Sequence, residues 1–168
     1  MIKVKDLMQK YGEYEIDEEK LKEILIKPKH KPKTVWDLEL KDKYWTFEAD
    51  GLIHSYLWAN RKCDQDMRDY GNVFLTREEA EFEIKRRKCE AIMLKYGTRD
   101  MMSLGGTKVD KYYITYNHEN DIFFIGSRVY MEANLICFSS EEFAQKAIDE
   151  IGEDRLKKYI FNVKKKVK

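Results

Sequence analysis

The sequence predicts an α+β fold: a duplicated strand-strand-(strand)-helix unit, with a mostly antiparallel sheet covered by helices and an N-terminal helical arm. Three observations lead to this prediction. Two stretches show the same order of strand-like and helix-like segments, amphipathic helical spacing follows each of them, and a basic, proline-containing linker precedes the first. The predicted parts are an arm and linker at 1–34, repeat units at 35–98 and 99–163, and a basic tail at 164–168.

The arm is predicted to hold two short helices. Apolar residues up to Tyr11 favour a first helix that ends at Gly12, because glycine is favoured just after a helix end. Asp17 is a good N-cap for a second helix, which must stop at Pro28. The basic linker at 27–33 is expected to be extended.

The first unit is predicted to open with Val35, Trp36 and Leu38 as an anchor that docks the chain onto the body. Strands follow at 44–47 and 52–58, on either side of an Asp50-Gly51 turn signal. We expect an irregular polar segment at 60–70, a third short strand at 72–75, and a helix from Arg77 to Tyr96 closed by Gly97.

The second unit follows a connector at 98–110. Its predicted strands are 112–116 and 122–125, with a third at 135–138. A helix is predicted from Ser140 to Ile151, because its apolar residues recur at helical spacing. Residues after Leu156 are expected to form a last turn or strand.

Both predicted helices start with the same signal. Thr76 and Glu79 form a capping-box pattern, as do Ser139 and Glu142. Two unrelated strand-to-helix junctions would also favour this pattern, so duplication rests additionally on the matching Lys-Tyr-aromatic starts. Hydrophobic staples are expected between these residues: Leu75 with Ala80, and Phe138 with Phe143.

Composition limits the class of protein. The chain is 43% hydrophobic and 38% charged, and no apolar run reaches the ~20 residues of a membrane span. With no signal-peptide pattern at the N-terminus, we expect a cytoplasmic protein. Cys63, Cys89 and Cys137 form no Cys-x-x-Cys pair, so neither a disulfide framework nor a zinc site is expected.

The charge is unevenly placed along the chain. Residues 99–154 carry 5 basic and 11 acidic side chains, whereas residues 155–168 carry 7 basic and no acidic ones. The lysine-rich end is a candidate for nucleic-acid binding through counterion release, although a solvated tail is the commoner role. The candidate nucleic-acid-binding residues are Arg155, Lys157, Lys158, Lys164, Lys165, Lys166 and Lys168.

No catalytic pattern is present in the sequence. His30, His54 and His118 are scattered and have no partner at ligand or catalytic spacing. The Gly105-Gly106 connector lacks the Gly-Lys-Ser/Thr order of a phosphate loop. We therefore expect a protein that is not an enzyme, with no catalytic residue, no metal and no cofactor.

Aromatic and acidic residues are the candidates for a partner-binding surface, because Tyr and Trp are enriched at interface hot spots. Stacking of bases and simple sheet packing are alternative roles for the aromatic residues. The candidate residues are Trp45, Tyr56, Trp58, Tyr113, Asp149, Glu150, Glu153 and Asp154.

Several motifs resemble a group of small phage and prophage proteins of Gram-positive bacteria. The likeness covers most of the chain, and its motifs label a family without carrying chemistry. The motifs are Val4-Lys5-Asp6-Leu7 with Tyr11-Gly12, Val35-Trp36-Asp37-Leu38, Lys43-Tyr44-Trp45, Asp50-Gly51 and Trp58, the run 71–81, and Ser139 to Glu142 with the run 147–159.

The resemblance implies a phage accessory protein that binds and inhibits a host defence protein, such as a CRISPR-Cas nuclease or its guide-RNA complex. The acidic segment 99–154 would then imitate phosphate charge. The alternative is a nucleic-acid-binding accessory protein that uses the basic tail. A third reading is an assembly protein that associates with itself through an open sheet edge.

Overall fold

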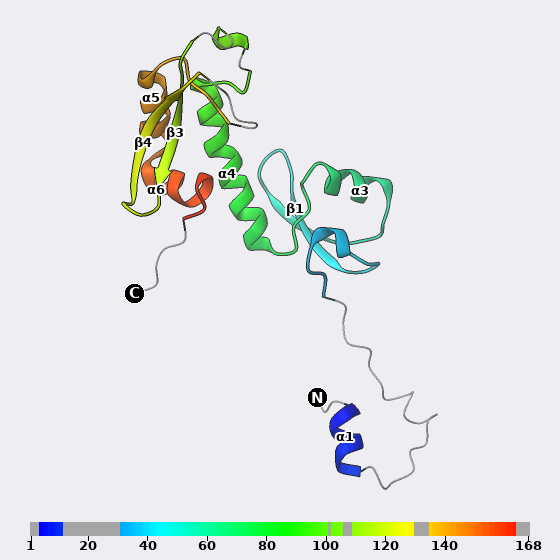
Figure 1. Ribbon diagram of the computed structural model, residues 1–168. Helices are drawn as coiled ribbons and strands as arrows, with labels where there is room; N and C mark the ends of the chain where they lie inside the picture. Colours follow the sequence, from blue (N-terminus) through cyan, green and yellow to red (C-terminus); the bar gives the residue numbers. More distant parts are fainter. Residues whose placement is uncertain (1–3, 12–30, 101, 106–108, 130–134, 164–168) are drawn as a thin grey trace. The chain divides into compact units, whose positions relative to one another are not determined.

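The computed structural model describes residues 4–11, 31–100, 102–105, 109–129 and 135–163 (Figure 1). The chain divides into two compact units, Met1–Lys31 and Pro32–Lys168. In the first unit, helix α1 (Val4–Tyr11) lies where the apolar spacing predicts a helix. The predicted second helix after Asp17 and most of the predicted linker lie outside the described residues.

The second unit opens with the short 3-10 helix η1 (Val35–Asp37), which Thr34 caps through a capping box. Leu38 is buried and Val35 packs against the same core. Trp36, by contrast, is 64% exposed, and it contacts the body by stacking on Arg68 at 4.4 Å and not by burial. The anchor uses the aliphatic residues on either side of the tryptophan.

A first β-hairpin follows at the predicted place. Strands β1 (Lys43–Phe47) and β2 (Ile53–Leu57) pair in antiparallel fashion. Gly51 in the turn has φ +84°, a left-handed conformation that glycine adopts without steric cost. On the other side of β1, Trp45 and Phe74 exchange two backbone hydrogen bonds of 2.8 Å. The third strand predicted at 72–75 is therefore a single bridge.

The prediction of an irregular segment at 60–70 is wrong, because helix α3 (Lys62–Asp69) occupies this part of the chain. The helix begins after Arg61, whose backbone N–H donates to the Asp64 carboxylate at 3.0 Å. Asp64 is held in turn by the hydroxyl of Tyr44, which lies 20 residues earlier in the chain. This long-range contact stabilises the start of a helix that has little apolar spacing of its own.

Helix α4 (Arg77–Tyr96) has the predicted bounds, and the predicted capping box of Thr76 and Glu79 is confirmed. Its apolar side chains point to opposite sides. Ile84 lines a groove with the first hairpin, whereas Met93 belongs to the core beneath the second hairpin. These two residues are separated by about two and a half turns, which places them on opposite faces of the helix. α4 therefore supports both hairpins, one with each half.

The second hairpin pairs β3 (Lys111–Asn117) with β4 (Ile122–Arg128). It follows a connector that contains the 3-10 helix η2 (Met102–Leu104). Tyr112 on β3 exchanges two backbone hydrogen bonds with Phe138, of 3.0 and 2.8 Å. The sheet topology corrects one expectation: each hairpin is a separate two-stranded sheet, and the described strands do not form a single sheet covered by helices.

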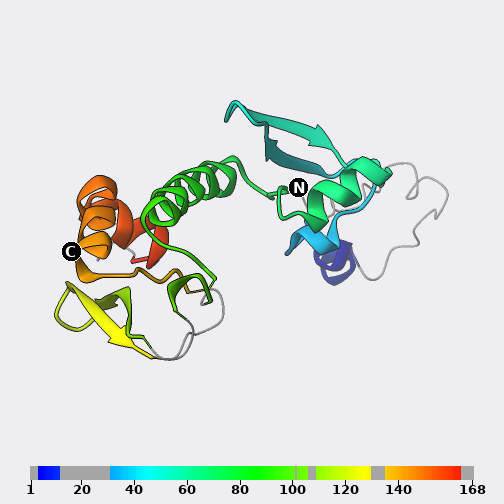
Figure 2. The same ribbon diagram turned by 90° about the horizontal axis from the view of Figure 1, so that it is seen from above.

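Helix α5 (Glu141–Ile151) ends at Gly152, as predicted, and the short helical turns α6 (Glu153–Arg155) and η4 (Leu156–Ile160) follow it. Figure 2 shows α5 and these turns beside the second hairpin. Their apolar faces close the larger of two cores. Its buried members are Cys89, Met93, Ile114, Ile136, Phe138, Ala144, Ala147, Ile148, Ile151 and Leu156.

The predicted cap of α5 is off by one residue. Ser140 is the N-cap, and its hydroxyl accepts from the backbone N–H of Phe143 at 3.3 Å. The capping box of Ser139 with Glu142 is therefore wrong. So is the Phe138–Phe143 staple, because the inward-facing residue one turn on is Ala144, which is fully buried.

This cap gives a direct test. Ser140→Ala is expected to lower the free energy of unfolding by about 1 kcal/mol, because the hydroxyl that satisfies an N-terminal N–H is lost. Ser139→Ala, at an exposed neighbouring position, is expected to change it by less than about 0.5 kcal/mol. Urea unfolding of the two variants measures both values, and equal losses would contradict this assignment of the cap.

Candidate functional site

A continuous row of aromatic side chains crosses the face of the first hairpin that carries Tyr44. Ring centroids of Tyr44 lie 5.7 Å from Trp58 on one side and 6.0 Å from Tyr56 on the other. His54 extends the row beyond Tyr56 at 6.3 Å. Tyr44 and Tyr56 are cross-strand partners in the ladder, so the strand register itself places these rings side by side.

At its other end, the row extends beyond the hairpin to Arg68 of α3, which contacts Trp58. The Arg68 guanidinium carbon lies 5.2 Å from the Trp58 ring centroid and 4.4 Å from that of Trp36. Arg68 is thus stacked between two indole rings, a cation–π arrangement that favours arginine. We call the set His54, Tyr56, Tyr44, Trp58, Arg68 and Trp36 the aromatic row.

The middle of the aromatic row is buried and its ends are exposed. Tyr44 and Trp58 are no more than 2% exposed, whereas Tyr56 is 42% and Trp36 is 64% exposed. A large exposed aromatic ring on a firmly packed base is the usual anatomy of a binding hot spot, because little conformational entropy is lost on docking. The row therefore presents two preorganised aromatic contacts.

Asp64 fixes the base of the row. Its carboxylate accepts from the hydroxyl of Tyr44 at 3.1 Å, from the backbone N–H of Ala59 at 3.3 Å and from that of Arg61 at 3.0 Å. Burial raises the pKa of Asp64, but the hydrogen bonds from Arg61 and Tyr44 outweigh it, and the pKa lies below its usual value. Burial, followed by the hydrogen bond to Asp64, raises the pKa of Tyr44 well above its usual value.

More exposed apolar residues lie near the exposed ends of the row. Lys41 and Asp42 hydrogen-bond through their backbones to Trp58 at 2.8 Å, which brings the segment containing Leu40 alongside the end of β2. Tyr70 ends α3 two residues after Arg68 and is 79% exposed. Surface apolar groups gathered in this way mark interaction sites in soluble proteins. The exposed apolar residues of this region are Trp36, Leu40, Leu52, Tyr56 and Tyr70.

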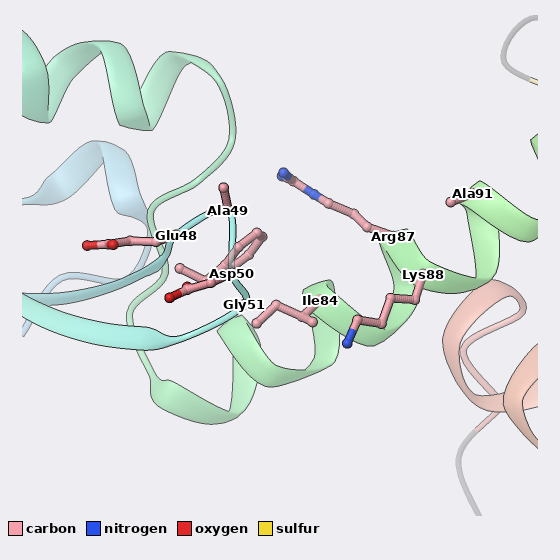
Figure 3. A pocket seen from close by; sticks show the side chains of 9 residues that line it. Glu48, Ala49, Asp50, Gly51, Ile84, Arg87, Lys88 and Ala91 are labelled. Carbon is pink, nitrogen blue, oxygen red and sulfur yellow. The ribbon is translucent and has the colours of Figure 1, made fainter.

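The opposite face of the hairpin forms an open groove against α4, with a volume of about 260 Å³ (Figure 3). Arg87 reaches across it from α4 and donates to the backbone oxygen of Gly71 at 3.0 Å, with its guanidinium over Phe47. In Figure 3, Glu48 points out of the groove, and the side chains of Arg87 and Lys88 diverge from each other. The polar groups do not converge, so this groove is a weaker candidate for a ligand site than the aromatic row.

The structure separates the residues predicted for a partner-binding surface. Tyr56 belongs to the aromatic row, and Trp45 lies on the other face of β1 beneath Lys43, whose ammonium is 4.5 Å from its ring. The prediction that Trp58 binds a partner is wrong. Trp58 is 2% exposed, so it is a core residue that supports the row and cannot contact a partner. Tyr113 lies on the second hairpin, across Gly126.

The predicted acidic residues lie at the end of α5 and the start of α6, separate from the aromatic row (Figures 1 and 2). Glu150 accepts from Lys95 at 2.7 Å and from the Tyr96 hydroxyl at 2.5 Å, so it links α5 to α4. Asp149, Glu153 and Asp154 are exposed. The acidic and aromatic parts of the prediction are thus two surfaces.

The candidate nucleic-acid-binding residues are only partly described. Lys157 forms an ion pair of 3.0 Å with Asp121 and lies over the rings of Tyr116 and Phe123. Arg155 interacts with the Cys89 thiol, whose pKa burial raises. Lys158 is exposed, and Lys164, Lys165, Lys166 and Lys168 lie outside the described residues.

Sequence reasoning missed the roles of Asp64, Arg68 and Tyr70, because all three fall in the segment predicted to be irregular. One signal was available: Asp64 and Arg68 are four residues apart, which is one helical turn. The exposure of Trp36 had no such signal.

No protein-family model, curated protein or solved structure matches this chain. Within the described ranges, no helix combines the length and the apolar character needed to cross a membrane. The same ranges hold no group of three or more His, Cys, Asp or Glu side chains placed to bind a metal ion.

Proposed function

We propose that this is a non-enzymatic protein-binding module whose partner docks on the exposed end of the aromatic row. The observation that carries the proposal is the stack of Trp36 on Arg68, which keeps a large aromatic ring in solvent on a packed base. Trp, Tyr and Arg dominate the energetics of protein interfaces, and this surface offers all three in Trp36, Tyr56, Tyr70 and Arg68.

The resemblance to small phage proteins supports a host protein as the partner. We propose a phage accessory protein that acts in the cytoplasm of the infected bacterium and inhibits a host defence protein, such as a CRISPR-Cas nuclease or its guide-RNA complex. The acidic surface of Asp149, Glu153 and Asp154 would contribute long-range attraction to a basic nucleic-acid channel in that partner.

We also propose that the two hairpin-and-helix segments are copies of one ancestral unit that follows an N-terminal helical arm. The support is local and specific. Trp45 with Phe74, and Tyr112 with Phe138, make the same pair of backbone hydrogen bonds, at the third residue of β1 and the second residue of β3. In each copy the bridge lies two residues before the hydroxyl that caps the next helix.

Affinity capture from host lysate tests the proposal, with nuclease treatment in parallel. Trp36→Ala is expected to weaken binding of the captured protein roughly 30-fold, the loss of about 2 kcal/mol typical of a hot spot. Phe143→Ala on α5 is the matched control, since it removes another exposed aromatic ring and is expected to bind normally.

Two results would overturn this function. Normal binding by Trp36→Ala would show that the partner docks elsewhere. Recovery of nucleic acid alone, lost as salt is raised, would replace the proposal with the nucleic-acid-binding alternative through the basic tail.

A further inference from the structure

The outer edge of β4 exposes unpaired backbone groups. Because Tyr112 hydrogen-bonds to Phe138 on one side of β3, the residues of β3 that bond to β4 are its odd-numbered ones. Phe123, Ile125 and Ser127 on β4 therefore direct their N–H and C=O groups outward. No described segment pairs with this edge, and Figure 1 shows β4 at the outside of the hairpin.

The β4 edge also lacks the usual protection against pairing. Natural edge strands are kept apart by lysine, proline, bulges or short length. β4 is seven residues long, and its sequence Ile-Phe-Phe-Ile-Gly-Ser-Arg contains one charged residue, at its end. Ile122 and Phe124 are about half exposed on the face turned away from α5. The outer edge of β2 is shorter and carries His54.

We propose that β4 pairs with β4 of a second copy of this chain, in antiparallel fashion about a two-fold axis at Ile125. This register joins Ile125 to Ile125 of the second copy and Phe123 to its Ser127, so all the outward groups of both strands are satisfied. The result is a four-stranded sheet with an isologous interface. The inference is independent of the aromatic row.

Charge complementarity selects a second copy in this orientation. Arg128 lies at one end of β4, and the exposed Glu119 lies in the turn at the other end, where Asp121 already pairs with Lys157. Antiparallel pairing places the Arg128 end of each copy beside the turn that carries Glu119 in the other. Parallel pairing would bring the two Arg128 side chains together, which is unfavourable.

The side chains on the exposed face fit the same register. The ring of Tyr113 lies across Gly126, where an added Cβ would be 2.6 Å from the ring. In the pair, Phe124 of one copy lies opposite Gly126 of the other, next to that copy's Tyr113. The pairing therefore covers the exposed Phe124 ring with an aromatic neighbour twice, once on each side of the axis.

Sedimentation equilibrium of the full chain tests the proposal. Wild type is expected to form a concentration-dependent dimer, and Ser127→Pro is expected to be monomeric, because proline removes an outward N–H without breaking the β3 ladder. Ser55→Pro is the matched control. Ser55 lies opposite Trp45 on β2 as Ser127 lies opposite Tyr112 on β4, and we expect this variant to dimerise normally.

Hydrogen exchange gives a second measurement that needs no variant. The amides of Phe123, Ile125 and Ser127 are expected to exchange more slowly as concentration rises, while those of Ile53, Ser55 and Leu57 stay unchanged. If Ser127→Pro fails to fold, Phe124→Lys replaces it, with Leu57→Lys as its control. A chain that stays monomeric at every concentration, or a dimer that persists in a folded β4 variant, would overturn the proposal.

Discussion

Asp64→Ala is expected to lower the free energy of unfolding by about 3 kcal/mol, among the largest effects of any single substitution in this chain. The carboxylate is fully buried, and its loss leaves the Tyr44 hydroxyl and the backbone N–H groups of Ala59 and Arg61 without their acceptor. Urea unfolding measures the loss. Asp69→Ala, at an exposed position on the same helix, is the control, and a change within about 0.5 kcal/mol is expected.

The same contact predicts a pH dependence. The pKa of Asp64 is lower in the folded protein than its ordinary 3.8, so the unfolded chain binds the proton more readily. The stability that Asp64 contributes is fully present above its ordinary pKa and is lost as pH falls through the folded value. We expect wild type to lose more stability than Asp64→Ala on acidification below about pH 4. Parallel slopes for the two proteins would contradict this assignment.

Phe138→Ala is expected to lower the free energy of unfolding by about 4 kcal/mol, because a fully buried aromatic side chain leaves a cavity in the larger core. Its backbone bridge to Tyr112 does not depend on the side chain, so the loss measures packing alone. Phe143→Ala, which removes an exposed ring of the same size, is expected to cost less than about 1 kcal/mol.

Phe138 also allows the two hairpins to be compared. Phe74 makes the equivalent bridge in the first hairpin, but it is only partly buried and stacks on Phe47 at 5.7 Å. Phe74→Ala is therefore expected to cost less than Phe138→Ala in the same unfolding measurement. An equal cost at the two positions would mean that the two hairpins are supported by cores of similar quality.

Local signals predicted most of the secondary structure. Thr76 with Glu79 fixes the start of α4, and Gly97 follows its last residue. The strands of both hairpins were predicted from aromatic and β-branched runs on either side of turn residues. Each of these signals acts within a few residues of the chain. Where two serines stood together before α5, the local pattern did not decide which of them caps the helix.

The candidate site was less predictable than the fold. Tyr56 was among the predicted binding residues and lies on the exposed part of the aromatic row, but Trp58 is core and Trp36 is exposed. Strand alternation divides side chains between two faces, and it does not say which face another segment covers. In this protein the covering group is Arg68 of α3, whose guanidinium lies between the indole rings of Trp58 and Trp36.

The sequence by itself determined the α+β class, both ends of α4 and the hairpin turns, because capping, turn chemistry and apolar spacing are properties of short segments. The tertiary structure alone decided that α3 is a helix, through the contact of Asp64 with a tyrosine 20 residues away. It alone decided that α4 packs on two opposite faces, which spreads its apolar residues around the helix. Burial is a property of the assembled fold, since it depends on segments that are distant in the chain.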